Sequence, residues 1–362
     1  MLKKTIRRLG ALAMVLAMAV SVFAVNASAT TGVGTNSLTI KKTVTADGNT
    51  YAPATTFTFS ISTAAKGEYD GEVVYEGVSG GAYFANNDNH NDNQIAFSAA
   101  DGIINGTTGK TKTTTISTDV SKFTAPGIYH YTVAETKDSY EGITYDTTVR
   151  DLYVYVTNGD SGLVVSNVVL TKDTTKMIGK EAVVEKTKTD EWVNDYGKNN
   201  NAIHSAKVTK TVSGNQGNKN KAFDFAVSVS GATGEKYKVA YKVNSTEEEK
   251  VTSVDSGAKP ITISIKDTGY IQIYGLSASD TYTVKEVEAN TDGYVTTING
   301  EATANGETSG HAAAADVSIE YKNEKNIATP GGVIMTIAPY ALMVVLAGAF
   351  AVVFLTRRNR AE

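Results

Sequence analysis

The two halves of this chain carry matching short segments in the same order. In the first half they read LTIKKTV, TTFTFSIS, IYHYTVAET and EWVNDY, and in the second AKVTKTV, AFDFAVSVS, DTYTVKEV and EYKNEK. Apolar and polar residues alternate within them, which is typical of strands that bury one face. Turn-forming stretches such as NGDSG and TDGY separate the strands. The repeat predicts an all-β protein of two tandem Ig-like β-sandwich domains.

A polar stretch rich in Asn and Gly, residues 197–205, interrupts the alternation and is typical of a short linker. It places the first domain at residues 30–198 and the second at residues 199–326. Residues outside these limits belong to neither repeat, and both ends of the chain have the composition of targeting segments.

The N-terminal end predicts a secretory signal peptide, residues 1–29. A basic start, MLKKTIRRLG, is followed by an apolar run and by NASA, whose small residues fit a cleavage site after Ala29. The mature protein is therefore expected to begin near Thr30 and to leave the cytoplasm.

The C-terminal end, residues 327–362, predicts a membrane anchor. An apolar stretch at about 334–355 is long enough to span a bilayer as a transmembrane helix. Arg357, Arg358 and Arg360 follow it, and such a basic tail stays in the cytoplasm. The domains are then held at the cell surface.

Composition excludes several classes of function. The chain has no cysteine, so this exported protein cannot form disulfides, and its net charge of −4 gives no case for nucleic-acid binding. The four histidines show no metal-binding spacing. The segment at 85–94 is rich in Asn and Asp but lacks the Gly and Glu of a calcium loop. We therefore expect no metal, no cofactor and no enzyme that turns over a substrate.

Each repeat begins with a lysine on the apolar face of its first strand. Lys42 shares a face with Leu38, Ile40 and Val44, and Lys210 shares one with a similar set: Ala206, Val208 and Val212. A single inward lysine is commonly a strand end with its ammonium in water. Two inward lysines at matching positions of the repeat predict that each has a buried partner.

Strand parity also indicates which residues are those partners. Glu135 shares a face with Tyr129, Tyr131 and Val133, and Glu286 occupies the matching position in the second repeat.

Near the end of each repeat, an asparagine also lies on the apolar face. Asn194 shares a face with Trp192 and Tyr196, and Asn323 shares one with Val317, Ile319 and Tyr321. Each domain thus directs one Lys, one Glu and one Asn into its core.

Two chemical outcomes are open for such a set. Lys and Glu alone could form a buried ion pair. The amide carbonyl of an Asn is, however, an electrophile, and burial favours the neutral, nucleophilic amine of Lys and the protonated form of Glu. A protonated Glu could hydrogen-bond the amide oxygen and pass a proton to departing ammonia. The product would be an amide between Lys and Asn, formed once per domain.

At these motifs the chain resembles the shaft pilins of Gram-positive bacteria that carry intramolecular isopeptide bonds, particularly the two-domain streptococcal T-antigen type. The resemblance rests on LTIKKTV and KVTKTVSG, on YTVAE and YTVKE, on WVND and EYKN, and on the C-terminal tail. It implies bonds from Lys42 to Asn194 and from Lys210 to Asn323. Glu135 and Glu286 would assist their formation.

Two other residues of the first domain compete for these positions. Asn158 also shares a face with apolar residues, but it precedes Gly and fits a hairpin turn better. Lys41 could replace Lys42 only if the strand register slipped, which would turn the apolar set outward. We therefore expect Lys42 and Asn194 to be the residues that are joined in the first domain.

The resemblance also implies a sorting signal cut by a sortase, at Thr329, Pro330, Gly331 and Gly332. Gly331 stands where such a signal has a Thr, and this departure argues against efficient cleavage by a sortase. Polymerisation would need an acceptor lysine, and the local candidates are Lys180, Lys186 and Lys188.

These expectations combine into one function and one alternative. The chain is expected to be a structural subunit of a surface pilus, with copies of itself, other pilus subunits, sortase and peptidoglycan as partners. The alternative is a surface adhesin on the same scaffold that recognises a host receptor through loops such as 79–94.

Overall fold

The computed structural model of the chain describes residues 36–87, 90–91, 93–178, 181–312, 314–327 and 342–351. The predicted signal peptide and the predicted sorting signal, Thr329 to Gly332, lie outside these residues. Within the apolar stretch at 334–355, residues 342–351 form a helix. No helix in the described ranges is both long and apolar enough to cross a bilayer. The predicted membrane anchor therefore stays a prediction.

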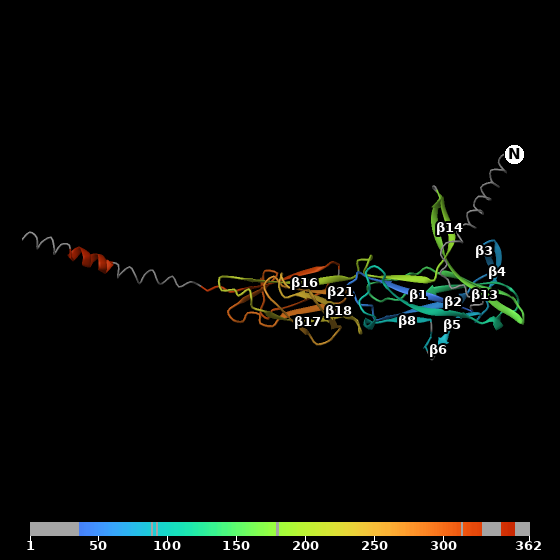
Figure 1. Cartoon of the computed structure of the whole chain (residues 1–362), viewed down its shortest axis with the longest axis horizontal. Helices are drawn as coiled ribbons and strands as arrows, with labels where there is room; N and C mark the ends of the chain where they lie inside the picture. Colours follow the sequence, from blue (N-terminus) through green and yellow to red (C-terminus); the bar gives the residue numbers. More distant parts are fainter. Residues whose placement is uncertain are drawn as a thin grey trace, which may run out of the picture. The chain divides into compact units, whose positions relative to one another are not determined.

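The described chain forms two compact units built almost wholly of β-strands, as the alternation predicts (Figure 1). Of the described residues, unit 1 takes 36–45, 55–97 and 107–195, and unit 2 takes those from 196 onward. Unit 2 also includes two segments from the first half of the sequence, 46–54 and 98–106. The alternation pattern describes strands only, so it could not assign these loops.

Unit 1 is built of two sheets. The five-stranded sheet has the order β11 (Ile143–Thr144), β15 (Glu191–Tyr196), β1 (Ser37–Thr45), β9 (Lys110–Thr118) and β5 (Ala82–Phe84). The larger sheet has the order β14 (Glu181–Lys188), β13 (Gly162–Ile178), β12 (Arg150–Gly159), β10 (Gly127–Glu135), β2 (Thr55–Thr63) and β8 (Gln94–Phe97), with β3 (Gly67–Tyr69) and β4 (Glu72–Glu76) attached beside β10. Strands β6 (Asn86–Asn87) and β7 (His90–Asn91) pair within the polar segment at 85–94.

Unit 2 repeats the two-sheet arrangement. Its larger sheet has the order β19 (Lys250–Asp255), β18 (Lys236–Lys242), β21 (Tyr270–Leu276), β16 (His204–Ser213), β26 (Val317–Glu324), β23 (Val295–Ile298) and β24 (Glu301–Ala302). The smaller sheet has the order β20 (Ile261–Ile265), β17 (Phe223–Ser230), β22 (Thr281–Glu286) and β25 (Glu307–Gly310). Among the described residues the remaining elements are two short 3-10 turns, Ala99–Asp101 and Val120–Lys122, and the helix at 342–351.

The first and last strands of each unit are parallel neighbours. β1 pairs with β15, and Lys42 lies opposite Trp192 in that register. β16 pairs with β26 in the same way, with Lys210 opposite Tyr321. The sequence repeat is therefore also a repeat of topology, in which the ends of each unit meet within one sheet.

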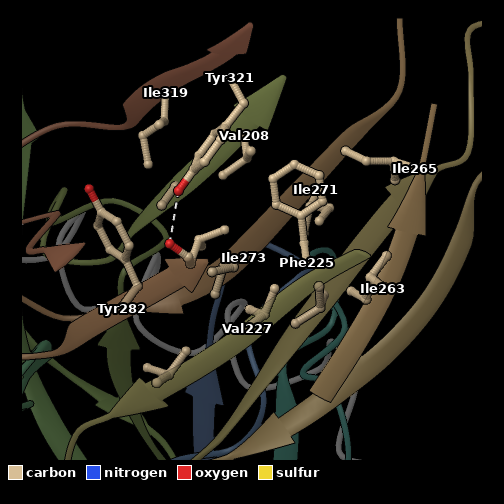
Figure 2. Packing of buried hydrophobic residues seen from close by; sticks show 14 of the residues in the cluster. Val208, Phe225, Val227, Ile263, Ile265, Ile271, Ile273, Tyr282, Ile319 and Tyr321 are labelled. Carbon is tan, nitrogen blue, oxygen red and sulfur yellow. Dashed lines mark hydrogen bonds between the residues drawn. The ribbon is translucent and has the colours of Figure 1, made fainter. Parts of the chain in front are cut away.

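Apolar side chains of the two sheets meet in the interior of each unit. In unit 2, Figure 2 shows Val208 and Ile271 of the larger sheet beside Phe225 of the smaller one, and all three are fully buried. In unit 1 the ring of Trp192 meets that of Phe59 edge to face, with centroids 5.2 Å apart, and so joins the sheets. Each such side chain stabilises the fold by roughly 1.5–3 kcal/mol relative to an exposed one.

The second half of β13, residues 171–178, pairs with β14 in a hairpin that extends away from the rest of the sheet (Figure 1). Its outer part carries exposed apolar side chains, including Met177 and Val184. Two of the three candidate acceptor lysines, Lys186 and Lys188, lie on β14, while Lys180 falls outside the described residues.

Candidate cross-linking sites

Strand alternation places Lys42 and Asn194 on the buried face of the five-stranded sheet of unit 1. They come from the parallel neighbours β1 and β15, and both side chains are inaccessible to solvent. Glu135 is the last residue of β10, in the facing sheet, and is 6% exposed. The structure therefore brings together the three residues that the sequence predicted for the first domain.

Glu135 lies between the other two residues of site 1, which we define as Lys42, Glu135 and Asn194. Lys42 Nζ donates to Glu135 Oε2 over 2.7 Å, and Asn194 Nδ2 donates to Glu135 Oε1 over 2.6 Å. The ammonium also lies over the ring of Phe57, 4.6 Å from its centroid. One carboxyl group thus contacts both the amine and the amide that a cross-link would join.

Burial moves the two ionisable groups of site 1 toward their neutral forms. It lowers the pKa of Lys42 to about 8, although the attraction of Glu135 acts in the opposite direction. Burial likewise raises the pKa of Glu135, against the effect of Lys42. The 2.7 Å hydrogen bond gives the proton a direct path from the amine to the carboxyl.

A further pair of residues borders site 1. The backbone N–H of Asp146 donates to Asn194 Oδ1 over 2.8 Å. Arg150 holds the Asp146 carboxylate with two hydrogen bonds, of 2.7 and 3.2 Å, and lies over the ring of Trp192 at 4.2 Å. Burial acts to raise the pKa of Asp146, but the hydrogen bonds from Arg150 and Thr148 lower it to about 2.

Site 2, which consists of Lys210, Glu286 and Asn323, repeats this arrangement in unit 2. Lys210 Nζ donates to Glu286 Oε2 over 2.7 Å, and Asn323 Nδ2 donates to Glu286 Oε1. Burial lowers the pKa of Lys210 to about 8, and its ammonium lies 4.3 Å from the centre of the Phe223 ring. The acid again comes from the facing sheet, since Glu286 ends β22.

The two sites differ at the amide oxygen. Asn323 Oδ1 is buried and has no hydrogen-bond partner within the described ranges, whereas Asn194 Oδ1 accepts from the Asp146 backbone. The sequence predicts a protonated Glu that donates to this oxygen. In both sites the acid accepts from the amide nitrogen instead, and in site 1 a backbone N–H occupies the side of the oxygen.

The two competing residues of the first domain lie elsewhere. Asn158 is exposed near the end of β12, beside the turn that leads into β13. Lys41 points out of the sheet, and its ammonium pairs with the carboxylate of Asp190 at 2.8 Å. Neither side chain lies with the buried set, which leaves Lys42 and Asn194 as the candidates.

Asp146 and Arg150 are not among the site residues predicted from the sequence. A signal for Arg150 was present, because it shares strand parity with the buried Leu152, Val154 and Val156, and it is itself 1% exposed. Asp146 lies outside any alternating segment and acts through its backbone. No residue pattern could have indicated that contact.

Among the candidate acceptor lysines, Lys186 is firmly paired. Its ammonium contacts the carboxylates of Asp151 at 2.5 Å and Asp173 at 2.9 Å. Partial burial acts to lower its pKa, but these hydrogen bonds raise the pKa well above the ordinary value. Lys186 is therefore held as an ammonium, which is not a nucleophile.

Comparisons with known proteins agree with the two-unit organisation. Residues 38–197 match the family described as the Spy0128-like isopeptide containing domain, and residues 204–325 match a domain of unknown function, DUF7601. A curated protein named "Pilin" from Streptococcus pyogenes serotype M1 is 26% identical over 276 residues, covering 70% of this chain and 75% of that protein. The resemblance to Gram-positive pilins is confirmed.

Solved pilin structures share the fold. The major pilin protein (T3.2) from Streptococcus pyogenes is 26% identical, with a TM-score of 0.55 over 81% of this chain and 98% of that one. Another major pilin from Streptococcus pyogenes has a TM-score of 0.55 and 22% identity, over 82% of this chain and all of that one. A curated "Pilus tip adhesin Cpa" from the same species is 26% identical over 129 residues, only 18% of its length.

Proposed function

We propose that this chain is a structural subunit of a sortase-assembled surface pilus, and that each of its two domains is closed by a Lys–Asn amide formed without an external enzyme. The observation that carries the proposal is the pair of buried triads, in which one carboxyl group contacts the lysine amine and the asparagine amide. An ordinary buried ion pair does not need the asparagine.

The first step of the proposed reaction is a proton transfer within the triad. Lys42 Nζ gives one proton to Glu135 along their 2.7 Å hydrogen bond, which leaves a neutral amine and a neutral acid. The low-dielectric core favours this exchange because it removes two buried charges. The amine of Lys210 is made available to Asn323 by Glu286 in the same way.

The second step forms one bond and breaks one. Nζ attacks Cγ of the asparagine, and negative charge develops on Oδ1 in the tetrahedral intermediate. When the carbonyl re-forms, the bond from Cγ to Nδ2 breaks. The proton that Nζ loses passes through the carboxyl group to Nδ2, which departs as ammonia, and the glutamate ends as a carboxylate beside an ammonium ion. The balance is one amide formed and one ammonia lost.

The proposed role of these bonds is mechanical. Each would join the first strand of a domain to the last, and those strands are parallel neighbours. Tension that enters along β1 would cross to β15 and leave the domain without loading residues 43–193. A pilus shaft needs this property because every subunit carries the full load.

The proposal includes export and attachment. The signal peptide at 1–29 delivers the chain outside the membrane, and the segment from Thr329 to Gly332 is joined by a sortase to a lysine of the next subunit or to peptidoglycan. The adhesin alternative has less support, because the adhesin match covers only 18% of that protein.

Intact mass tests the cross-links. A protein comprising residues 30–326 is expected to weigh less than its sequence by two molecules of ammonia. Glu135→Ala and Glu286→Ala are each expected to restore one of them, while the exposed control Glu68→Ala restores neither. A protein of full calculated mass would reject the proposal and leave both lysines as members of buried ion pairs.

A further inference from the structure

The carbonyl oxygen of Asn194 has a fixed hydrogen-bond donor that its counterpart in unit 2 lacks. The Asp146 backbone N–H reaches Asn194 Oδ1 at 2.8 Å, whereas Asn323 Oδ1 is buried without a partner in the part of the chain that the structure describes. In the proposed reaction this oxygen is the atom that gains negative charge. Donors aimed at such an atom are commonly the largest single contribution to acyl-transfer catalysis.

The same contact fixes the orientation of the Asn194 amide. A backbone N–H can only donate, so the atom that faces it must be the oxygen. Nδ2 is then directed to Glu135 Oε1, at 2.6 Å, where the leaving nitrogen can collect its proton. In site 2, among the described residues, only Glu286 orients the amide, because Asn323 Oδ1 contacts no donor there.

Arg150 determines where the Asp146 backbone lies. Its guanidinium binds both carboxylate oxygens of Asp146, donates to Thr148 O at 2.5 Å and donates to Glu191 O at 2.8 Å. Glu191 is the first residue of β15, the strand that carries Asn194. Arg150 therefore ties the segment that supplies the N–H donor to the strand that supplies the amide.

We propose that the backbone N–H of Asp146 is the oxyanion donor of site 1, and that Arg150 is the residue that positions it. This inference rests on the proposed cross-linking function. It assigns separate tasks to two groups: Glu135 moves the protons and the Asp146 backbone stabilises the charge on Oδ1. Site 2 has no such donor among the residues that the structure describes, so we infer that its bond forms more slowly after folding than the bond of site 1.

The test measures how fast each bond forms in the full mature chain. Residues 30–326 are assembled by ligating segments in denaturant, where no reaction can occur, and are then refolded by dilution. Fluorescence of Trp192, the single tryptophan, reports folding of unit 1. Samples are quenched and digested, and the two cross-linked peptides are quantified by mass.

The decisive variant replaces the Asp146 N–H with an ester oxygen and leaves every side chain unchanged. It is expected to slow bond formation in site 1 on the order of 10²-fold, the usual effect of losing one oxyanion donor. Bond formation in site 2 should not change, and it serves as the internal reference. The same replacement at the exposed neighbour Thr147 is the matched control and should leave both rates unchanged.

A second measurement tests the role of Arg150. Arg150→Lys keeps the charge but loses the bidentate hydrogen bonding to the Asp146 carboxylate. It should therefore slow bond formation in site 1 when the backbone is unaltered. In the ester backbone it should slow site 1 no further, because the N–H it positions is already absent. Additive effects of the two changes would show that Arg150 acts on folding or packing alone.

The outcomes separate this inference from the function on which it rests. If the ester at Asp146 leaves the rate of site 1 unchanged while both bonds form, the donor assignment fails and the cross-links stand. If site 1 of the unaltered chain closes no faster than site 2, the inferred order of closure fails. If the unaltered chain loses no ammonia after refolding, the proposed function fails too.

Discussion

Lys42 and Asn194 lie on adjacent parallel strands with a stagger of two residues, because Lys42 is in register with Trp192. Lys210 and Asn323 show the same stagger, since Lys210 is in register with Tyr321. A stagger of two keeps both side chains on one face of the sheet. The long lysine side chain can therefore reach diagonally toward the asparagine without any change of register.

Removing the first cross-link is expected to destabilise unit 1. Lys42→Met keeps an unbranched side chain in the core but removes the nucleophile, so the chain between residues 42 and 194 is no longer closed. For a closed loop of this size, the loss of entropy in the unfolded chain raises the free energy of unfolding by roughly 4–5 kcal/mol, and Lys42→Met should lose that contribution. That corresponds to a fall in Tm of roughly 10–20 °C in calorimetry of residues 30–326.

The control for this experiment is the neighbouring residue. Lys41→Met changes the same chemical group on the same strand, but its side chain is 47% exposed, so Tm should scarcely change. Equal values of Tm for the two variants would contradict a covalent closure at Lys42.

The rate of bond formation in site 1 is expected to fall above pH 8. Between the raised pKa of Glu135 and the lowered pKa of Lys42, about 8, the pair holds one exchangeable proton, which is the form that reacts. At higher pH that proton is lost and none is left for the departing ammonia. At low pH both groups are protonated and the amine is blocked. The profile should therefore be bell-shaped.

Refolding at a series of pH values, with cross-linked peptide quantified by mass, measures this profile. A rate that continues to rise toward pH 10, the ordinary range for lysine, would contradict the role given to the Glu135 proton. Loss of the reaction in Glu135→Gln at every pH is expected, because the amide cannot shuttle protons.

Single-molecule stretching should reveal the load path. Residues 30–326 held by their ends are expected to show no unfolding step at forces that break only non-covalent contacts. In Lys42→Met, unit 1 should open and release residues 43–193, an extension of roughly 50 nm at the fully extended length per residue. Lys41→Met should behave as the unaltered chain does. A step of that length in the unaltered chain would show that no bond closes unit 1.

Polymer assembly on the cell is expected to depend on the sorting segment and on a lysine other than Lys186. Gly331→Thr restores the residue expected in a sorting signal and should increase the high-mass ladder in a blot of cell-wall extract. Lys186→Arg should leave the ladder intact, since Asp151 and Asp173 hold that ammonium charged. Lys180→Arg and Lys188→Arg test the two other candidates. If the ladder is lost in Lys186→Arg and in neither of the other variants, Lys186 is the acceptor and this prediction is wrong.

Much of the candidate site could be read from the sequence. The alternation of buried and exposed positions is a local property of an extended backbone, so six residues in two repeats could be assigned to the core without knowing the fold. Burial confirms these positions for Lys42, Glu135, Asn194 and their counterparts in unit 2. The same local rule predicts that Lys42 points inward and its neighbour Lys41 outward, as their exposure shows.

What the sequence determined by itself is which side chains turn inward, because that depends only on the two-residue period of a strand. Tertiary structure alone decided which strands become neighbours: β1 beside β15 in parallel, with Glu135 reaching them from the facing sheet. It also placed the Asp146 backbone at the amide oxygen of Asn194, 48 residues further along the chain. Such contacts join parts of the chain that no local pattern links, since they arise only when the sheets close around a shared core.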